Sequence, residues 1–221
     1  MSIAAQDKYQ KSWQERQDHA ESMQPIIGKL YRNKGIEITV YGRPLVNATT
    51  IDIIKAHKTV SEFEAQKLRL RESMPFLEAI NQLNLSAARI DLGKLAYSYL
   101  YKDAANGLSI EDYLKNQLSE VINSDAQVEP QDVVLYGFGR IGRLLARLLI
   151  EKSGPNASLR LRAIVLRGGD LEKRASLLRR DSVHGPFNGS ITVDHEANAI
   201  KANGAYIQVI YADAPDKIDY T

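Results

Sequence analysis

One stretch decides how this chain folds: Asp132-Val-Val-Leu-Tyr-Gly137-Phe-Gly139-Arg140-Ile-Gly142-Arg143. A short apolar strand leads into a G-x-G-x-x-G turn, and an amphipathic helix follows directly over about 140–153. This strand–turn–helix setting is typical of a site for a dinucleotide pyrophosphate. In such a turn Gly137 allows the tight bend, Gly139 lets the backbone approach the ligand, and Gly142 lets the helix pack closely on the strand.

The sequence beyond this turn continues to alternate between strand and helix. The pattern predicts a strand over 159–166, a short helix over 171–180, and short antiparallel strands with an Asn203-Gly204 hairpin turn before a strand over 205–211. In the helix after the glycine turn, core spacing favours burial of Ile141, Leu144, Leu145, Leu148 and Leu149. Arg143 and Arg147, one turn apart, are expected on its exposed face.

Residues 1–128 are predicted to form a mostly helical N-terminal extension. Helices are expected over about 3–30, with Pro25 breaking or bending the first, and over 50–57, 61–84, 86–103 and 109–122; a strand is expected over 36–41. A polar stretch with a proline, 123–131, separates this region from residues 129–221. The fold class expected is therefore α/β: an incomplete Rossmann-type parallel sheet preceded by a helical region.

Composition narrows the classes of function. The 221 residues are 44% hydrophobic, so a packed core is expected, and no apolar run approaches the ~20 residues that span a bilayer. The sequence contains no cysteine, which excludes disulfides, thiolate metal sites and a cysteine nucleophile in these residues. No signal peptide and no histidine or carboxylate cluster with ligand spacing is found, so we expect a cytoplasmic protein with neither a membrane nor a metal site.

The net charge of +2 is unevenly distributed. Residues 131–180 carry 11 Lys and Arg against 4 Asp and Glu, so the basic excess lies around the glycine turn. A basic segment suits a polyanionic ligand, although a solvated helix face has the same composition. Nucleic-acid binding is a rival interpretation, but no nucleic-acid-binding motif is present, and we expect no nucleic-acid partner.

Two motifs resemble those of one known family. Gly137-Phe-Gly-Arg-Ile-Gly-Arg143 is similar to the N-terminal signature of glyceraldehyde-3-phosphate dehydrogenases, and Asp181-Ser-Val-His-Gly-Pro-Phe187 is similar to that family's Asp-Ser-Thr-His-Gly-x-Phe segment. Asn203-Gly204 and Ala214-Pro-Asp-Lys-Ile218 match its later hairpin and turn. The resemblance covers about 132–221 and implies that the backbone at Arg140 and Ile141 contacts the cofactor pyrophosphate. The candidate cofactor-binding residues are Gly137, Phe138, Gly139, Arg140, Ile141, Gly142 and Arg167.

The sequence departs from the family where the second strand ends. The family has Asn-Asp there, whose carboxylate takes the adenosine ribose hydroxyls, whereas an ungapped alignment places Val165 and Leu166, followed by Arg167. A leucine cannot accept a hydrogen bond from the 2′-hydroxyl, and Arg167 can pair with a 2′-phosphate. NADP therefore stands beside NAD as the expected cofactor. Asp170 is the alternative carboxylate for the ribose hydroxyls, and the alternative for Arg167 is a solvated side chain without a ligand. A further departure is Asp213, which replaces the family's arginine before its Asp-Pro turn.

The resemblance implies phosphorylating oxidation of an aldehyde, with glyceraldehyde 3-phosphate as the first candidate and hydride transfer to NAD or NADP. In that family a cysteine attacks the aldehyde; no such residue is present here, so no catalytic residue is assigned, and we expect a fragment that is inactive alone. The open alternatives are an erythrose-4-phosphate dehydrogenase and a non-catalytic NADP-binding module. A homo-oligomer, a tetramer by resemblance, is also expected.

Overall fold

The computed structural model describes residues 3–102, 105–122, 129–154 and 157–218. The chain divides into two compact units, Met1–Gln127 and Val128–Thr221. Most of the expected boundary, 123–128, lies outside the described residues. No helix in the described ranges is both long and apolar enough to cross a membrane.

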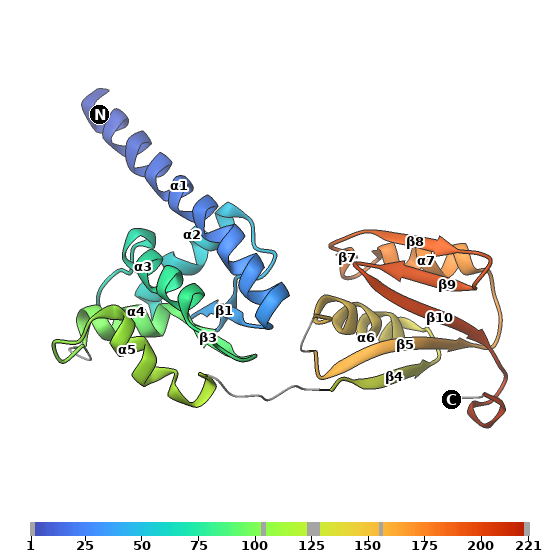
Figure 1. The fold of residues 1–221 in the computed structure, drawn as a ribbon. Coiled ribbons are helices and arrows are strands. Elements are labelled where there is room, and N and C mark those ends of the chain that lie inside the picture. Colours follow the sequence, from blue (N-terminus) through green and yellow to red (C-terminus); the bar gives the residue numbers. More distant parts are fainter. Residues whose placement is uncertain (1–2, 103–104, 123–128, 155–156, 219–221) are drawn as a thin grey trace. The chain divides into compact units, whose positions relative to one another are not determined.

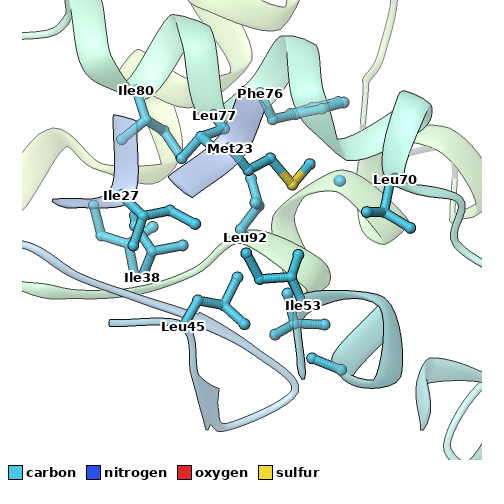
Figure 2. Close-up of a cluster of buried hydrophobic side chains, with 14 of the residues drawn as sticks. Met23, Ile27, Ile38, Leu45, Ile53, Leu70, Phe76, Leu77, Ile80 and Leu92 are labelled. Carbon is cyan, nitrogen blue, oxygen red and sulfur yellow. The ribbon is translucent and has the colours of Figure 1, made fainter. Parts of the chain in front are cut away.

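The first unit is built from helices around a small sheet. Its elements are α1 (Ile3–Lys34), β1 (Glu37–Val40), β2 (Arg43–Pro44), α2 (Thr50–Lys58), α3 (Leu70–Gln82), β3 (Arg89–Asp91), α4 (Leu92–Tyr101) and α5 (Ile110–Gln117), with 3-10 turns at Thr59–Glu62 and Ser119–Val121. The sheet order is β2-β1-β3, with β2 antiparallel and β3 parallel to β1. Figure 2 shows the core, in which side chains from α1, β1, α2, α3 and α4 meet.

The first helix is not broken at Pro25, one of the two outcomes, a break or a bend, that the sequence predicts there. It continues to Lys34 as one 32-residue helix. Met23, Ile27 and Leu30 lie on both sides of the proline and are buried. Their packing against the rest of the core holds the helix together across the missing N–H of the proline. The half of α1 before Ala20 is largely exposed and projects from the unit (Figure 1).

Three further helix predictions in this unit are wrong in their bounds. The helix expected over 109–122 is α5, which ends at Gln117 and is followed by the 3-10 turn Ser119–Val121. The helix expected over 61–84 begins only at Leu70, because the carboxylate of Glu72 accepts the backbone N–H of Arg69 at 2.7 Å and fixes the start of α3. The helix expected over 86–103 is instead β3 followed by α4. Asp91 separates the two, since its side chain accepts the N–H of Lys94 at 3.0 Å and caps α4.

The second unit contains the predicted strand–helix alternation. Its elements are β4 (Gln131–Tyr136), α6 (Arg140–Glu151), β5 (Leu159–Leu166), α7 (Leu171–Arg179), β6 (Arg180–Asp181), β7 (Gly185–Pro186), β8 (Ile191–Asp194), β9 (Ala199–Ala202), β10 (Ala205–Tyr211) and a 3-10 turn at Pro215–Lys217. The main sheet has the order β4-β5-β10-β9-β8. The three strands β4, β5 and β10 run parallel, and α6 and α7 pack against the sheet (Figure 1). This is the α/β, Rossmann-type arrangement that the sequence predicts, and the fold class is confirmed.

The C-terminal strands only partly follow the prediction. The Asn203-Gly204 turn does connect two antiparallel strands, β9 and β10. However, β10 also pairs in parallel with β5, with Tyr211 opposite Leu166. The last strand therefore joins the parallel sheet instead of belonging to a separate antiparallel tail, and its carboxyl end lies beside that of β5.

Helix α6 buries a different face from the one expected. Ala146, Arg147 and Ile150 are buried, whereas Ile141, Leu145 and Leu148 are exposed, and Leu144 and Leu149 are intermediate. The expected exposure of Arg143 and Arg147 is therefore wrong. Arg147 is only 5% exposed, because its guanidinium donates to the backbone carbonyl of Leu178 at 2.8 Å and to that of Gly185 at 3.0 Å. Backbone carbonyls that satisfy its donors make the burial of this charge tolerable.

Candidate functional site

The glycine turn lies between the end of β4 and the start of α6. Gly137 has a φ of +94°, which favours glycine, and its N–H donates to the carbonyl of Val165 on β5 at 2.8 Å. The side chain of Phe138 is buried in the core of the unit, so only its backbone is available to a ligand. A Cβ at Gly142 would strike the carbonyl oxygen of Gly137. The third glycine is therefore required by the close approach of helix and turn.

Gly139 leaves space open in front of the helix. It occupies the N-cap position of α6, where its lack of a side chain leaves the first turn uncapped. A Cβ built at Gly139 would meet no atom within 4 Å, so the fold itself does not require a glycine at this position. The space that the missing side chain leaves is open to a ligand.

The first turn of α6 can hold an anionic group. Arg140 and Ile141 are exposed, and the N–H groups of the first turn have no carbonyl partner within the helix. The helix dipole adds about half a positive charge at this end. Unpaired N–H groups, a positive dipole end and an open approach at Gly139 together fit a pyrophosphate.

The segment Asp181–Phe187, the second motif, contacts two arginines of α6, the helix that follows the glycine turn. Asp181 lies beside Arg143, with Oδ2 to Nη2 at 3.2 Å, and its Oδ1 accepts the N–H groups of Val183 and His184 at 2.9 and 3.1 Å. These two backbone hydrogen bonds, together with Arg143, lower the pKa of Asp181 to about 2. Arg147 binds the carbonyl of Gly185 in the same loop. The two motifs, separated in sequence, therefore meet in the fold.

His184 itself is exposed, and no ion pair to it is found in the described part of the chain. Its backbone N–H, rather than its imidazole, takes part in the loop. No group of three histidine, aspartate or glutamate residues that can hold a metal ion is found within the described ranges.

The end of β5 lies at the same edge of the sheet as the glycine turn. Leu166 is 4% exposed and points into the core, whereas Arg167 is exposed directly after the strand. Asp170, the alternative acid, accepts the N–H of Lys173 at 2.7 Å and is the N-cap of α7. Its carboxylate is therefore already committed to the helix.

Two residues near this edge were missed by the sequence analysis. The hydroxyl of Tyr136, on β4, donates to the carbonyl of Asp213, beyond β10, at 2.7 Å. Because β5 lies between those strands, the tyrosine crosses the carboxyl end of the sheet. Arg174 Nη2 donates to the carbonyl of Gly168, in the loop after Arg167, at 2.9 Å. Neither contact has a local sequence signal, because each depends on how separate segments meet.

The second unit is similar to a known family of dehydrogenase domains. Residues 131–221 match the model of a family described as "Glyceraldehyde 3-phosphate dehydrogenase, NAD binding domain". This segment belongs to the glyceraldehyde-3-phosphate dehydrogenase family. The predicted family is thereby confirmed, and the segment is an NAD-binding domain by this match.

The similar proteins carry related names. A "Glyceraldehyde-3-phosphate dehydrogenase-like protein" of Pseudomonas aeruginosa (strain UCBPP-PA14) is 54% identical over 207 residues, covering 90% of this chain and 44% of the relative. The glyceraldehyde-3-phosphate dehydrogenase of Thermotoga maritima is 33% identical over 88 residues, covering 40% of this chain and 25% of the relative. The glyceraldehyde-3-phosphate dehydrogenase of Zymomonas mobilis is 39% identical over 77 residues, covering 35% of this chain and 21% of the relative.

The extent of these matches differs. The chain spans less than half the length of the relatives that it matches. The Pseudomonas match is much longer than the 91-residue segment 131–221, so the likeness to that relative extends into the helical first unit.

Proposed function

We propose that residues 129–221 bind NAD or NADP as the cofactor-binding portion of a phosphorylating glyceraldehyde-3-phosphate dehydrogenase-like oxidoreductase. The observation that carries this proposal is the open, uncapped start of α6, where a Cβ at Gly139 would meet nothing within 4 Å. An anionic ligand placed there receives the unpaired N–H groups of the first turn. The family match over the same segment supports the dinucleotide as that ligand.

Each proposed contact has a defined role. Gly137 and Gly142 shape the turn, and Gly139 admits the pyrophosphate to the backbone. The backbone at Phe138, Arg140 and Ile141 lines the pyrophosphate, and the exposed Arg140 side chain adds a positive charge beside it. Arg167 lies on the adenosine side, after β5. A bound cofactor would supply a nicotinamide ring as hydride acceptor, and these residues would only position it.

The substrate of the proposed reaction is a small phosphorylated aldehyde, glyceraldehyde 3-phosphate in the first instance. The family's nucleophile is a cysteine, and this sequence contains none. We therefore propose that the 221 residues supply the cofactor site and not the nucleophile, and that they do not oxidise the aldehyde by themselves. The same observation favours, as a second candidate, a non-catalytic dinucleotide-binding module.

Calorimetric titration of the chain with NAD and, separately, with NADP tests the proposal. We expect one site per chain, and we expect Gly139→Val to abolish binding while leaving the far-UV circular dichroism unchanged, because the valine fills ligand space at a position where a Cβ meets no protein atom within 4 Å. A wild-type chain that binds neither NAD nor NADP would falsify the proposal. Reduction of NAD by the chain in the presence of aldehyde and phosphate would contradict the proposal that these residues do not supply the nucleophile.

A homo-oligomer is also proposed for this protein. Ile141, Leu145 and Leu148 present exposed apolar side chains along α6, at 76%, 44% and 44% of their full exposure. Such a row is typical of a surface that another element covers. Light scattering over a range of concentrations tests the assembly state, and a strictly monomeric chain at all concentrations contradicts it.

A further inference from the structure

The first helix of the chain, α1, presents one stripe of side chains along most of its length. In alternate steps of four and three residues the stripe passes through Tyr9, Trp13, Arg16, Ala20, Met23, Ile27 and Leu30. Such spacing keeps side chains on one face of a helix and is typical of helices that pair with each other. The four members from Ala20 onward are at most 2% exposed and lie in the core of the first unit. The face that the core covers therefore continues onto the half of α1 that projects from the unit (Figure 1).

The projecting part of this stripe, Tyr9, Trp13 and Arg16, is incompletely covered. Tyr9 is 67% exposed, and Trp13 packs against the core but is only partly buried. The guanidinium carbon of Arg16 lies 6.0 Å from the ring centroid of Tyr9 and 5.5 Å from that of Trp13, so it contacts both rings. Tyrosine, tryptophan and arginine are the side chains that most often dominate the binding energy of protein interfaces. The three residues therefore have the composition of an interface centre and lie on one helix face.

The charges of the projecting half indicate which way a partner helix runs. Residues 3–11 carry two lysines and one aspartate, whereas residues 12–21 carry three carboxylates and one arginine. Two copies of this helix that run antiparallel place the basic end of each beside the acidic part of the other, and parallel copies place like charges together. Antiparallel helices also keep the two cores, which begin at Ala20, at opposite ends of the pair. Charge complementarity therefore favours a second copy of this chain in antiparallel order.

We propose that the stripe of Tyr9, Trp13 and Arg16 is an interface on which α1 of a second copy of this chain packs antiparallel. In the pair, the rings of each copy cover those of the other and lose their exposure to water. The projecting residues 3–19 form about 25 Å of largely exposed helix, and a helix of that length is only marginally stable alone. Pairing therefore stabilises the projecting helix as well as joining two chains. This interface is separate from the cofactor site and from the exposed row on α6, both of which belong to the second unit.

The test combines sedimentation velocity of the full chain with the fluorescence of Trp13, the single tryptophan, over a range of concentrations. We expect a dimer that forms as the concentration rises, together with a blue shift of the Trp13 emission as its ring leaves water. Tyr9→Glu is expected to weaken the dimer at least about tenfold, as for an aromatic residue at an interface centre. Gln14→Glu is the matched control, because it adds the same charge at an exposed position off the stripe. The affinity for NAD should be unchanged in both variants.

Three results overturn the inference. They are a monomeric chain at every concentration, a dimer without a change in the Trp13 emission, and equal weakening by Tyr9→Glu and Gln14→Glu, which reflects net charge alone. Assembly through α6 is distinguished by Leu145→Glu. If that variant abolishes the dimer and Tyr9→Glu does not, α6 and not α1 joins the chains, and the inference is wrong. Each of these results leaves the proposed cofactor site standing, because NAD binding is measured separately.

The orientation of the pair is tested with single spin labels, because the chain contains no cysteine of its own. Lys11→Cys and Asp18→Cys place a label at exposed positions, two helical turns apart, on the face of α1 away from the stripe. In an antiparallel pair centred near residue 11, the two labels at position 18 are offset along the axis by about 21 Å, since each residue advances about 1.5 Å and both labels move apart. Pulsed electron paramagnetic resonance should therefore give a longer distance at 18 than at 11. Equal distances indicate parallel helices and contradict the proposal.

Discussion

Gly142→Ala should damage the second unit even though alanine is the better helix former. A Cβ there strikes the carbonyl oxygen of Gly137, which belongs to the backbone and cannot rotate away. Overpacking of this kind costs about 1–3 kcal/mol, and alanine regains at most about 1 kcal/mol of helix propensity. Because the contact is with backbone, we place the cost at the upper end of that range, about 2–3 kcal/mol. We therefore expect a net loss of about 1–2 kcal/mol, which lowers the urea midpoint of this unit by about 1 M.

The assay can separate the two units. The single tryptophan, Trp13, lies in the first unit, so its fluorescence follows that unit alone, whereas far-UV circular dichroism follows both. The variant should shift the dichroism transition of the second unit and leave the tryptophan transition in place. Gly139→Val is the matched comparison: it should keep the stability and lose NAD binding. A Gly142→Ala chain as stable as the wild type, or more stable, would refute the assignment of close packing to this glycine.

Three other perturbations have expected outcomes. Burial lowers the pKa of His57 to about 4, below its unfolded value near 6.5, so the fold favours the neutral imidazole. The contribution of this group to the free energy of unfolding of the first unit is fully present above pH 6.5. That free energy should fall by about 3 kcal/mol as the pH drops to 4. Urea unfolding followed by Trp13 fluorescence across this range checks it, and a flat profile contradicts it. Arg147→Met should destabilise the second unit by about 2–4 kcal/mol, because two backbone carbonyls lose their donors. Urea unfolding measures this change, and a loss under about 1 kcal/mol counts against a stabilising role of these hydrogen bonds. Asp181→Ala should lower the melting temperature more than Asp181→Asn, since asparagine keeps an oxygen for the two backbone N–H groups of the loop; equal losses would show that the ion pair dominates.

Sequence patterns predicted the elements whose signals are local. The strand Leu159–Leu166 has the predicted bounds, because alternating Leu and Arg that lead into an apolar run need no distant partner to be recognised. The start of α5 was likewise predicted, since Ser109 accepts the N–H of Asp112 within one turn. The glycine turn belongs to this group, because strand, turn and helix are contiguous.

The predictions failed where a distant segment decides the outcome. Arg147 is buried because the carbonyls of Leu178 and Gly185, more than thirty residues away, satisfy its guanidinium. Likewise, the three residues of β3 form a strand because β1 pairs with them, with Ile90 opposite Ile38. At the candidate site, Arg174 was missed for the same reason: its role depends on the path of the loop after β5. Helical spacing in α6 showed that one face is apolar but did not show which face meets the sheet.

The contact between Arg143 and Asp181 has a consequence for how this segment can change in evolution. The arginine belongs to the first motif and the aspartate to the second, and the pair is largely enclosed, with side-chain exposures of 14% and 10%. A substitution at either position leaves a nearly enclosed charge without its partner, so the two positions should vary together among related sequences. Transplanting the glycine turn alone into another Rossmann scaffold should then give a misplaced helix, and the loop of the second motif must be transferred with it.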